Sequence, residues 1–254
     1  MHKFDDLPPI VLITVATLMS FHAVAAEIHL DTDKLKNGDC HFYLNGMIEK
    51  GDNLKLLKAV IELPSEMTCH YILHLNSKGG DVYEALSMHR RISGPFNFIT
   101  VVQDNSECSS SCVFLLAAGN SRFPWGKIGI HRPYTLNVTN QIESKKVFDE
   151  LEYKVSELFK EQGISIELWH RMIAVPPESV YWLSDSEKLA YGVKGENPSY
   201  ADSRDSILAQ KYQISKMEYL RRKSLIDTEC RYGKVKIENI GNCIDQVYKH
   251  GTYN

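Results

Sequence analysis

Residues 108–119 read Cys-Ser-Ser-Ser-Cys-Val-Phe-Leu-Leu-Ala-Ala-Gly. The serines precede a short apolar helix that Gly119 ends, because glycine is common just after a helix C-terminus. A second segment, residues 127–133, reads Lys-Ile-Gly-Ile-His-Arg-Pro and places His131 after a strand-like run. A hydroxyl and a base are the minimum for covalent acyl transfer. We therefore take Ser110 as the candidate nucleophile and His131 as the candidate general base.

A glycine pair upstream completes this candidate site. Residues 76–81 read Asn-Ser-Lys-Gly-Gly-Asp and follow a strand predicted over residues 70–75. Glycines allow close backbone approach, so the N–H of Gly80 is a candidate oxyanion donor. The N–H of Ser111, at the start of the predicted helix, is the second. Taken singly, an ordinary β–α turn explains the glycine pair equally well, and a serine N-cap explains the serines better than catalysis does.

Strand-like and helix-like segments alternate along the chain. Strands are predicted at residues 40–48, 70–75, 98–102, 122–123 and 128–131, helices at 53–63, 82–92, 111–118, 143–172 and 185–192, and a short strand or turn at 180–183. Short connections between such segments imply parallel strands covered by helices, which is the α/β class. We also expect Asp52 to cap the first helix and a hairpin-like turn to follow residues 122–123.

The composition is that of a globular protein without a strong charge bias. The chain has 254 residues, 43% of them hydrophobic and 24% charged, with a formal net charge of -3. This length suits one large domain or two small ones. The weak negative charge favours neither nucleic acid nor an anionic membrane surface as a partner.

The N-terminal segment has the pattern of a secretory signal peptide. Residues 10–21 form an apolar run, and Ala-Val-Ala at residues 23–25 is a small-residue cleavage site. We assign residues 1–26 to a signal peptide, which implies a periplasmic or secreted protein. Asp5 and Asp6 depart from the usual positive start, so an uncleaved N-terminal membrane anchor is the alternative.

The ordered set of motifs resembles the Clp protease proteolytic subunit, ClpP, of the ClpP/crotonase superfamily. The resemblance covers roughly residues 38–197. It includes residues 182–193, Trp-Leu-Ser-Asp-Ser-Glu-Lys-Leu-Ala-Tyr-Gly-Val, which are similar to the Phe-Leu-Ser … Glu-Ala … Tyr-Gly-Leu segment of that family. The cysteines beside the serine resemble those of ClpP-like periplasmic proteins. The resemblance implies a superhelix of stacked ββα units, assembly into homo-oligomeric rings and a peptide or protein substrate.

Residue by residue, the resemblance implies catalytic roles for four positions. Ser110 matches the family nucleophile, and His131 matches the general base in Ile-His-x-Pro. Gly80 and Ser111 match the backbone donors of the oxyanion hole. No metal, nucleotide or other cofactor is implied.

The chain departs from the family pattern at two positions. Val180 stands where the family has the aspartate that orients the base, although Glu178 and Asp185 lie close in sequence. The site is therefore a Ser–His dyad, recruits another acid, or is inactive. Lys78 replaces a proline before the glycine pair, and a lysine base is an alternative to its being a solvated loop residue.

Six cysteines fit an oxidising compartment and allow fifteen disulfide pairings. The implied fold suggests Cys40–Cys69, Cys108–Cys112 and Cys230–Cys243, with buried free thiols as the alternative for each pair. The spacings do not suit a zinc site. A bridge around Ser110 leads to the hypothesis that a thiol reductant alters its reactivity.

The sequence thus predicts an exported serine hydrolase, most simply a peptidase. The alternatives are a catalytically inactive scaffold or peptide-binding protein with the same fold, and a crotonase-type enzyme acting on acyl thioesters. The expected organisation is a signal peptide or anchor over residues 1–26, a ClpP/crotonase-like domain over 27–198, and a helical, cysteine-containing extension over 199–254 packed on that domain.

Overall fold

The computed structural model describes residues 25–64, 66–94, 96–134, 141–231 and 235–253. The expected signal peptide or anchor lies almost wholly outside these residues. Within the described part of the chain, no helix has both the length and the apolar character needed to cross a bilayer.

A six-stranded sheet forms the centre of the fold, in the order β1-β2-β3-β4-β6-β9. Its strands are β1 (Glu27–Leu30), β2 (Asp39–Asn45), β3 (His70–Asn76), β4 (Ile99–Val102), β6 (Ser121–Pro124) and β9 (Gly195–Glu196). The middle four strands are parallel, and both edge strands run antiparallel to their neighbours. A short 3-10 helix, Thr32–Asn37, connects β1 to β2.

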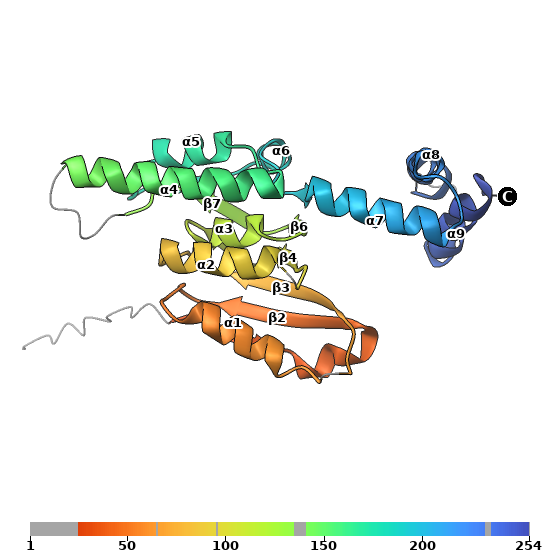
Figure 1. The fold of residues 1–254 in the computed structure, drawn as a ribbon, viewed down its shortest axis with the longest axis horizontal. Coiled ribbons are helices and arrows are strands. Elements are labelled where there is room, and N and C mark those ends of the chain that lie inside the picture. The colour runs from red at the N-terminus through yellow and green to blue at the C-terminus, as the bar shows by residue number, and fades with distance from the viewer. Residues whose placement is uncertain (1–24, 65, 95, 135–140, 232–234, 254) are drawn as a thin grey trace, which may run out of the picture.

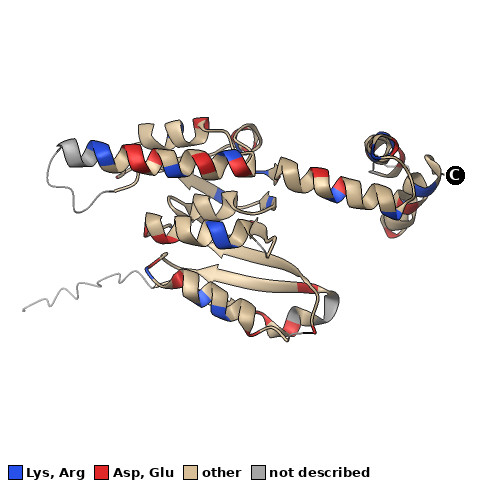
Figure 2. Ribbon diagram, viewed as in Figure 1, with Lys and Arg blue, Asp and Glu red and all other residues tan. Residues whose placement is uncertain are grey.

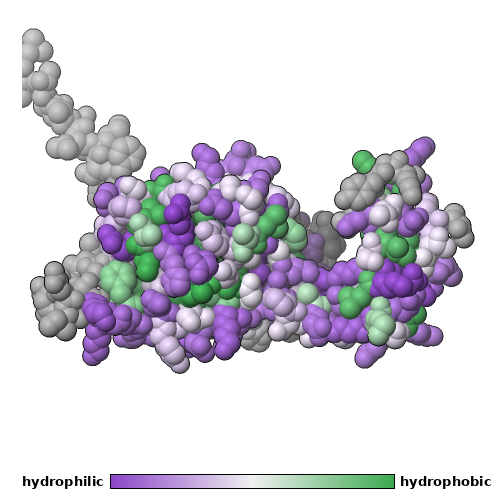
Figure 3. Space-filling model, turned by 90° about the horizontal axis from the view of Figure 1, so that it is seen from above, coloured by the Kyte–Doolittle hydropathy of each residue, from purple (hydrophilic) through white to green (hydrophobic). Residues whose placement is uncertain are grey.

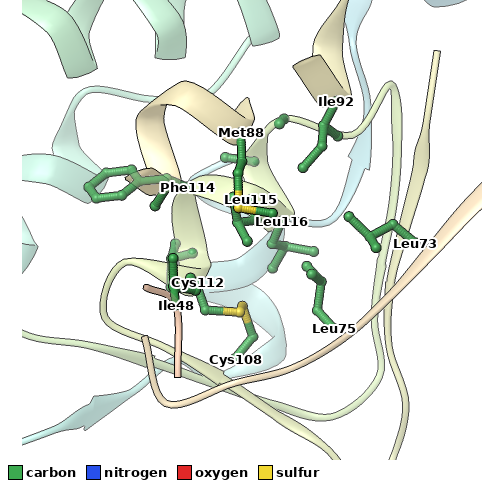
Figure 4. Close-up of a cluster of buried hydrophobic side chains, with 14 of the residues drawn as sticks. Ile48, Leu73, Leu75, Met88, Ile92, Cys108, Cys112, Phe114, Leu115 and Leu116 are labelled. Carbon is green, nitrogen blue, oxygen red and sulfur yellow. A yellow bond between two sulfur atoms is a disulfide. The ribbon is translucent and has the colours of Figure 1, made fainter. Parts of the chain in front are cut away.

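Three helices connect the parallel strands. They are α1 (Asp52–Ile61), α2 (Val82–Ser93) and α3 (Cys112–Ala117). Figure 1 shows α1 and α2 lying over one face of the sheet. The main core fills the space beneath them: Leu73 and Leu75 of β3 meet Met88 and Ile92 of α2 and the apolar residues of α3 (Figure 4).

The first helix begins differently from the prediction. Gly51, with φ +105°, is its N-cap, and Asp52 is already the first helical residue. The Asp52 carboxylate is fully buried, accepts a hydrogen bond from the Glu49 N–H at 2.8 Å and pairs with Lys55 at 2.7 Å. A glycine takes the cap position because this backbone conformation is costly for any other residue.

A second, three-stranded sheet lies beside the first, in the order β5-β7-β8. Its strands are β5 (Glu107–Ser109), β7 (Lys127–Ile130) and β8 (Tyr181–Trp182). β5 and β7 are parallel, whereas β7 and β8 are antiparallel. The expected hairpin-like turn is therefore wrong as a pairing, because β6 and β7 belong to different sheets.

Helices from the second half of the chain cover this part of the molecule. α4 (Gln141–Gln162) and α5 (Glu167–Ala174) divide the single helix predicted over residues 143–172, and α6 (Asp185–Ala190) follows β8. The division falls at Gly163, whose φ is +66°. A Cβ there would lie 2.4 Å from Pro198, so only glycine permits this crossing.

The C-terminal residues form a helical extension with a core of its own. It contains α7 (Pro198–Lys211), α8 (Lys216–Ile226), a π-helical turn (Asp227–Arg231), a 3-10 turn (Ile237–Asn239) and α9 (Ile240–His250). Its apolar cluster includes Ile226, Val247 and the Cys230–Cys243 disulfide. Figure 1 shows α8 and α9 at the far end of α7, so the expectation that the extension packs on the main domain is wrong.

Charges are distributed evenly over the described residues. Figure 2 shows acidic and basic positions interspersed along α4 and α7. Seen from the side of α4 and α5, polar and apolar side chains alternate over the surface of the main body and of the extension (Figure 3).

Candidate active site

Ser110 occupies a sharp turn between β5 and α3. Its φ is +55°, one of three positive values among the non-glycine residues described. This left-handed conformation is uncommon for serine and persists only where the surrounding structure holds the residue in it. The residue is half-buried, and its carbonyl accepts the Val113 N–H that starts the helix, at 3.1 Å. The hydroxyl therefore sits on a strained corner rather than inside a regular helix.

His131 follows the neighbouring strand at the same end of the sheet. The parallel register pairs Ser109 of β5 with Gly129 of β7. Ser110 and His131 consequently leave two adjacent strands at their carboxyl ends, within one residue of register. Strands in a sheet are about 4.8 Å apart, so the two side chains belong to one site. No hydrogen bond joins Ser110 Oγ to His131 among the described residues.

Burial adjusts the His131 imidazole toward its neutral form. Desolvation lowers the pKa of His131, and a weaker interaction with the Arg132 backbone acts in the opposite direction. Nδ1 is buried with no hydrogen-bond partner in the described chain. A neutral imidazole can accept a proton from a hydroxyl, so the lowered pKa suits a general base.

The glycine pair is tightly packed, and Gly79 lies directly against the serine. A Cβ on Gly79, whose φ is +96°, would lie 2.6 Å from Ser110 Cβ and 2.9 Å from the Ser111 nitrogen. A Cβ on Gly80 would lie 2.1 Å from the Ile48 carbonyl oxygen. Both positions therefore require glycine, because backbone from two other segments fills the space of a side chain.

Two backbone N–H groups, those of Gly80 and Ser111, belong to the segments that meet at Ser110. The Gly79 carbonyl accepts the Ile48 N–H at 2.8 Å. Since a peptide unit is planar and trans, the Gly80 N–H points the opposite way, away from Ile48. Neither this N–H nor that of Ser111 has an acceptor among the residues the structure describes. Such donors are what an oxyanion hole requires.

The two candidate acids have other surroundings than a bond to the imidazole. Asp185 begins α6 and is exposed, and its carboxylate accepts a hydrogen bond from the buried Lys188 ammonium at 3.0 Å. That bond lowers the pKa of Asp185. Glu178 is exposed in the turn before β8. The structure gives neither carboxylate a hydrogen bond to His131.

Val180 instead faces the histidine. The antiparallel register of β7 and β8 ends with the pair Ile130 and Tyr181, and its continuation by one residue places His131 opposite Val180. Opposed residues of an antiparallel pair have Cβ atoms about 5 Å apart. The position that the family pattern gives to the orienting aspartate is thus next to the imidazole, and here its side chain is apolar.

Lys78 is an exposed residue beside Glu107. Its side chain is 78% exposed, and Nζ lies 3.8 Å from Glu107 Oε1. The two residues help to line a polar cavity of about 510 Å³ that Lys127 also borders. Among the described residues, the structure gives the Lys78 ammonium no hydrogen bond to Ser110.

The structure joins the cysteines in the three pairs that the implied fold suggested: Cys40–Cys69, Cys108–Cys112 and Cys230–Cys243. These bonds are compatible with a periplasmic or extracellular protein. The Cys108–Cys112 bridge brackets Ser110 and is fully buried against Ile48 and Leu75 (Figure 4). Ser110 thus lies in a turn that a buried disulfide closes.

Three further residues shape the site and were not singled out from the sequence: Gly129, Trp182 and Tyr134. Gly129 lets the side chains of Val180 and Trp182 fold over β7, because its absent Cβ would lie 2.7 Å and 2.8 Å from them. Tyr134 contacts the His131 ring. Gly129 could have been found, since glycine inside a strand marks close packing. Nothing in the sequence pattern distinguished the two aromatic residues.

Comparisons with known proteins give likenesses to solved structures alone. No protein-family model matches the chain, and no curated protein matches it. Among solved structures, a mutant of the 1510-N membrane-bound stomatin-specific protease is similar, with a TM-score of 0.48 and 17% sequence identity. The similarity covers 60% of this chain and 75% of that one. We base no functional inference on a likeness of this degree.

Proposed function

We propose that this chain is an exported serine hydrolase of the ClpP-like type that cleaves peptide bonds. The observation that carries the proposal is the strained turn at Ser110, with φ +55°, beside His131 and two unoccupied backbone donors. Strain at a hydroxyl that packing alone does not require is typical of functional sites. A turn with only a structural role would not require a neutral imidazole on the adjacent strand.

The proposed reaction proceeds through an acyl-enzyme. Ser110 Oγ attacks the peptide carbonyl while His131 accepts its proton, and the N–H groups of Gly80 and Ser111 bind the oxyanion. His131 then returns the proton to the leaving amine, and water releases the acyl group by the reverse sequence. An extended peptide beside Gly79 and Gly80 would present its carbonyl to these donors by strand addition.

Labelling with a fluorophosphonate probe tests this function. We expect modification of Ser110, mapped by mass spectrometry on the protein with its disulfides intact, and hydrolysis of a fluorogenic peptide library. Ser110→Ala removes the modification, and His131→Ala slows it by at least about a hundredfold. Ser206→Ala, a substitution in the C-terminal extension, is the matched control. Failure of Ser110 to react in the wild-type protein contradicts the proposal.

One specific observation favours a second function. Val180 stands opposite His131, and Nδ1 of that imidazole is buried without a partner among the described residues. Removing the acid from a triad costs about four orders of magnitude in rate. A peptide-binding scaffold that keeps the fold without turnover has the same features. Peptide binding without Ser110 labelling identifies this alternative.

The remaining expectations complete the proposal. Residues 27–198 form the domain that carries the site, residues 199–254 form the separate helical extension, and the chain self-associates. Export fits the disulfides, and membrane attachment applies only if the N-terminal segment is retained. Sedimentation of the mature protein measures the oligomeric state directly.

A further inference from the structure

The histidine of the site needs an orienting contact that no carboxylate supplies. A base must present one ring nitrogen to the hydroxyl, and in a triad an acid fixes that orientation through the other nitrogen. Here Nδ1 of His131 is buried and unpartnered among the described residues, and the facing residue is Val180. The orientation must therefore come from packing around the ring.

Tyr134 makes the one ring contact with this imidazole that the structure describes. The centroids of the two rings are 6.1 Å apart at an interplanar angle of 72°, which is the edge-to-face arrangement that aromatic pairs prefer. Tyr134 comes three residues after His131, beyond the end of β7. The residue is 57% exposed, so it contributes little to the core of the protein.

The hydroxyl of Tyr134 anchors this ring to the other side of the site. It donates a hydrogen bond of 2.9 Å to the carbonyl of Pro177. A second bond, of 2.9 Å, runs from the Arg132 N–H to the Val175 carbonyl. Residues 132–134 are thus attached at two points to residues 175–177, the segment that leads to Val180. His131 lies between this attachment and the paired strands β7 and β8.

We propose that Tyr134 is a positioning residue for His131, whose ring contact and hydrogen bond to Pro177 replace the orienting acid of a triad. The inference rests on the proposed function of the site and adds the means by which its base is held. Because this tyrosine is exposed, its hydrogen bond to a backbone carbonyl adds little to the packing of the protein. Its ring and its hydroxyl have separable tasks, the first on the imidazole and the second on the tether.

The test compares labelling rates of Ser110 by a fluorophosphonate between pH 5 and 9. We expect Tyr134→Ala to slow labelling about tenfold, since aromatic pairs of this geometry contribute on that order. We also expect its pH midpoint to rise, because loss of the ring exposes the imidazole and reverses the burial that lowers the pKa of His131. Tyr134→Phe keeps the ring and should retain most of the rate. Tyr153→Ala, at a tyrosine 69% exposed on α4, is the matched control.

A double-mutant comparison separates positioning from a structural role. Val180→Asp places a carboxylate opposite His131. The substitution should accelerate labelling more in the Tyr134→Ala protein than in the wild type, because the new carboxylate and the Tyr134 ring would both orient the same imidazole. Circular dichroism and the thermal midpoint establish that each variant is folded. A merely structural tyrosine would give equal acceleration in both backgrounds and an unmoved pH midpoint.

The possible outcomes test this inference separately from the proposed hydrolase function. Wild-type labelling together with unaltered labelling of Tyr134→Ala overturns the positioning role and leaves the hydrolase standing. Absence of wild-type labelling overturns the hydrolase and the positioning role together. Slowed labelling, a raised pH midpoint and the larger effect of Val180→Asp support the inference.

Discussion

The backbone N–H of Ser110 donates a hydrogen bond to the carbonyl of Gly129, 3.0 Å away. This bond extends the pairing of β5 with β7 by one residue, to the point where the chain turns into α3. The candidate nucleophile is therefore fixed to the strand that leads to His131. Two catalytic candidates separated by twenty residues of chain are held by one sheet, and changes to that sheet should affect both.

The contact between Gly79 and Ser110 gives the first prediction. Gly79→Ala adds a Cβ 2.6 Å from Ser110 Cβ at a φ of +96°. We expect labelling of Ser110 to be lost, together with a fall in the free energy of unfolding that exceeds the roughly 1–2 kcal/mol of φ strain alone. Urea titration and probe labelling measure the two effects.

Gly51→Ala is the matched control for that substitution. Gly51 has a φ of +105°, and nothing lies within 4 Å of the added Cβ. It should therefore lose only the free energy of φ strain and keep its reactivity at Ser110. Equal loss of labelling in both variants would show that global destabilisation, and not the contact with Ser110, is responsible.

The second prediction concerns Asp185, a candidate acid from the sequence. Its carboxylate is bound to Lys188, whose ammonium also donates to the carbonyls of Pro124 and Gly126. We therefore expect Asp185→Asn to leave the rate and the pH midpoint of Ser110 labelling unchanged. A fall in rate comparable to that of His131→Ala would instead identify Asp185 as the acid of a triad.

The disulfide around Ser110 gives the third prediction. The double variant Cys108→Ala/Cys112→Ala frees the turn that carries the hydroxyl, and closing so short a loop is worth about 2 kcal/mol of stability. We expect slower labelling of Ser110 and a lower free energy of unfolding. Reduction of the wild-type protein should reproduce this effect once the buried bond is opened.

The remote disulfide is the control for this experiment. Cys230→Ala/Cys243→Ala removes a bridge of the C-terminal extension, so it should increase hydrogen exchange in α8 and α9 while Ser110 reacts at its wild-type rate. If both double variants slow labelling alike, the Cys108–Cys112 bridge has no particular effect on the nucleophile.

The alternating core of the fold could be predicted because its local signals agree. Apolar β2, β3 and β4 and the amphipathic α1 and α2 fall close to their predicted bounds. β5 escaped prediction because its three residues, Glu107–Ser109, carry no period of their own and exist through pairing with β7. The division of the long helix at Gly163 depended on a contact with Pro198, which lies far away in sequence.

The candidate site shows the same division between local and distant information. Ser110, His131 and Gly80 lie at the ends of strands, where spacing alone suggests chemistry. The neighbours of the imidazole depend on the register of β7 with β8, which brings Val180 to it and leaves Asp185 with Lys188. Closeness in sequence to position 180 was a poor guide to the neighbours of His131, because the pairing of β7 with β8 decides which side chain faces the imidazole.

The last prediction concerns His89, a buried histidine of α2. Its Nδ1 donates to the Phe114 carbonyl at 2.8 Å, and Nε2 is buried with no partner in the described chain. Burial lowers the pKa of His89 from 6.5 to about 4, since a charge cannot be solvated there. In the unfolded chain the same group titrates near its ordinary value, so the unfolded state binds the extra proton first as the pH falls.

The neutral His89 therefore stabilises the fold above about pH 6.5, and this contribution is lost progressively down to about pH 4. The loss amounts to at most about 3 kcal/mol. His89→Gln, which keeps a donor for the Phe114 carbonyl but does not titrate, should flatten the decline of unfolding free energy in this window. His250→Gln, at the exposed end of α9, is the control. Parallel curves for the wild type and His89→Gln would show that another group causes the acid sensitivity.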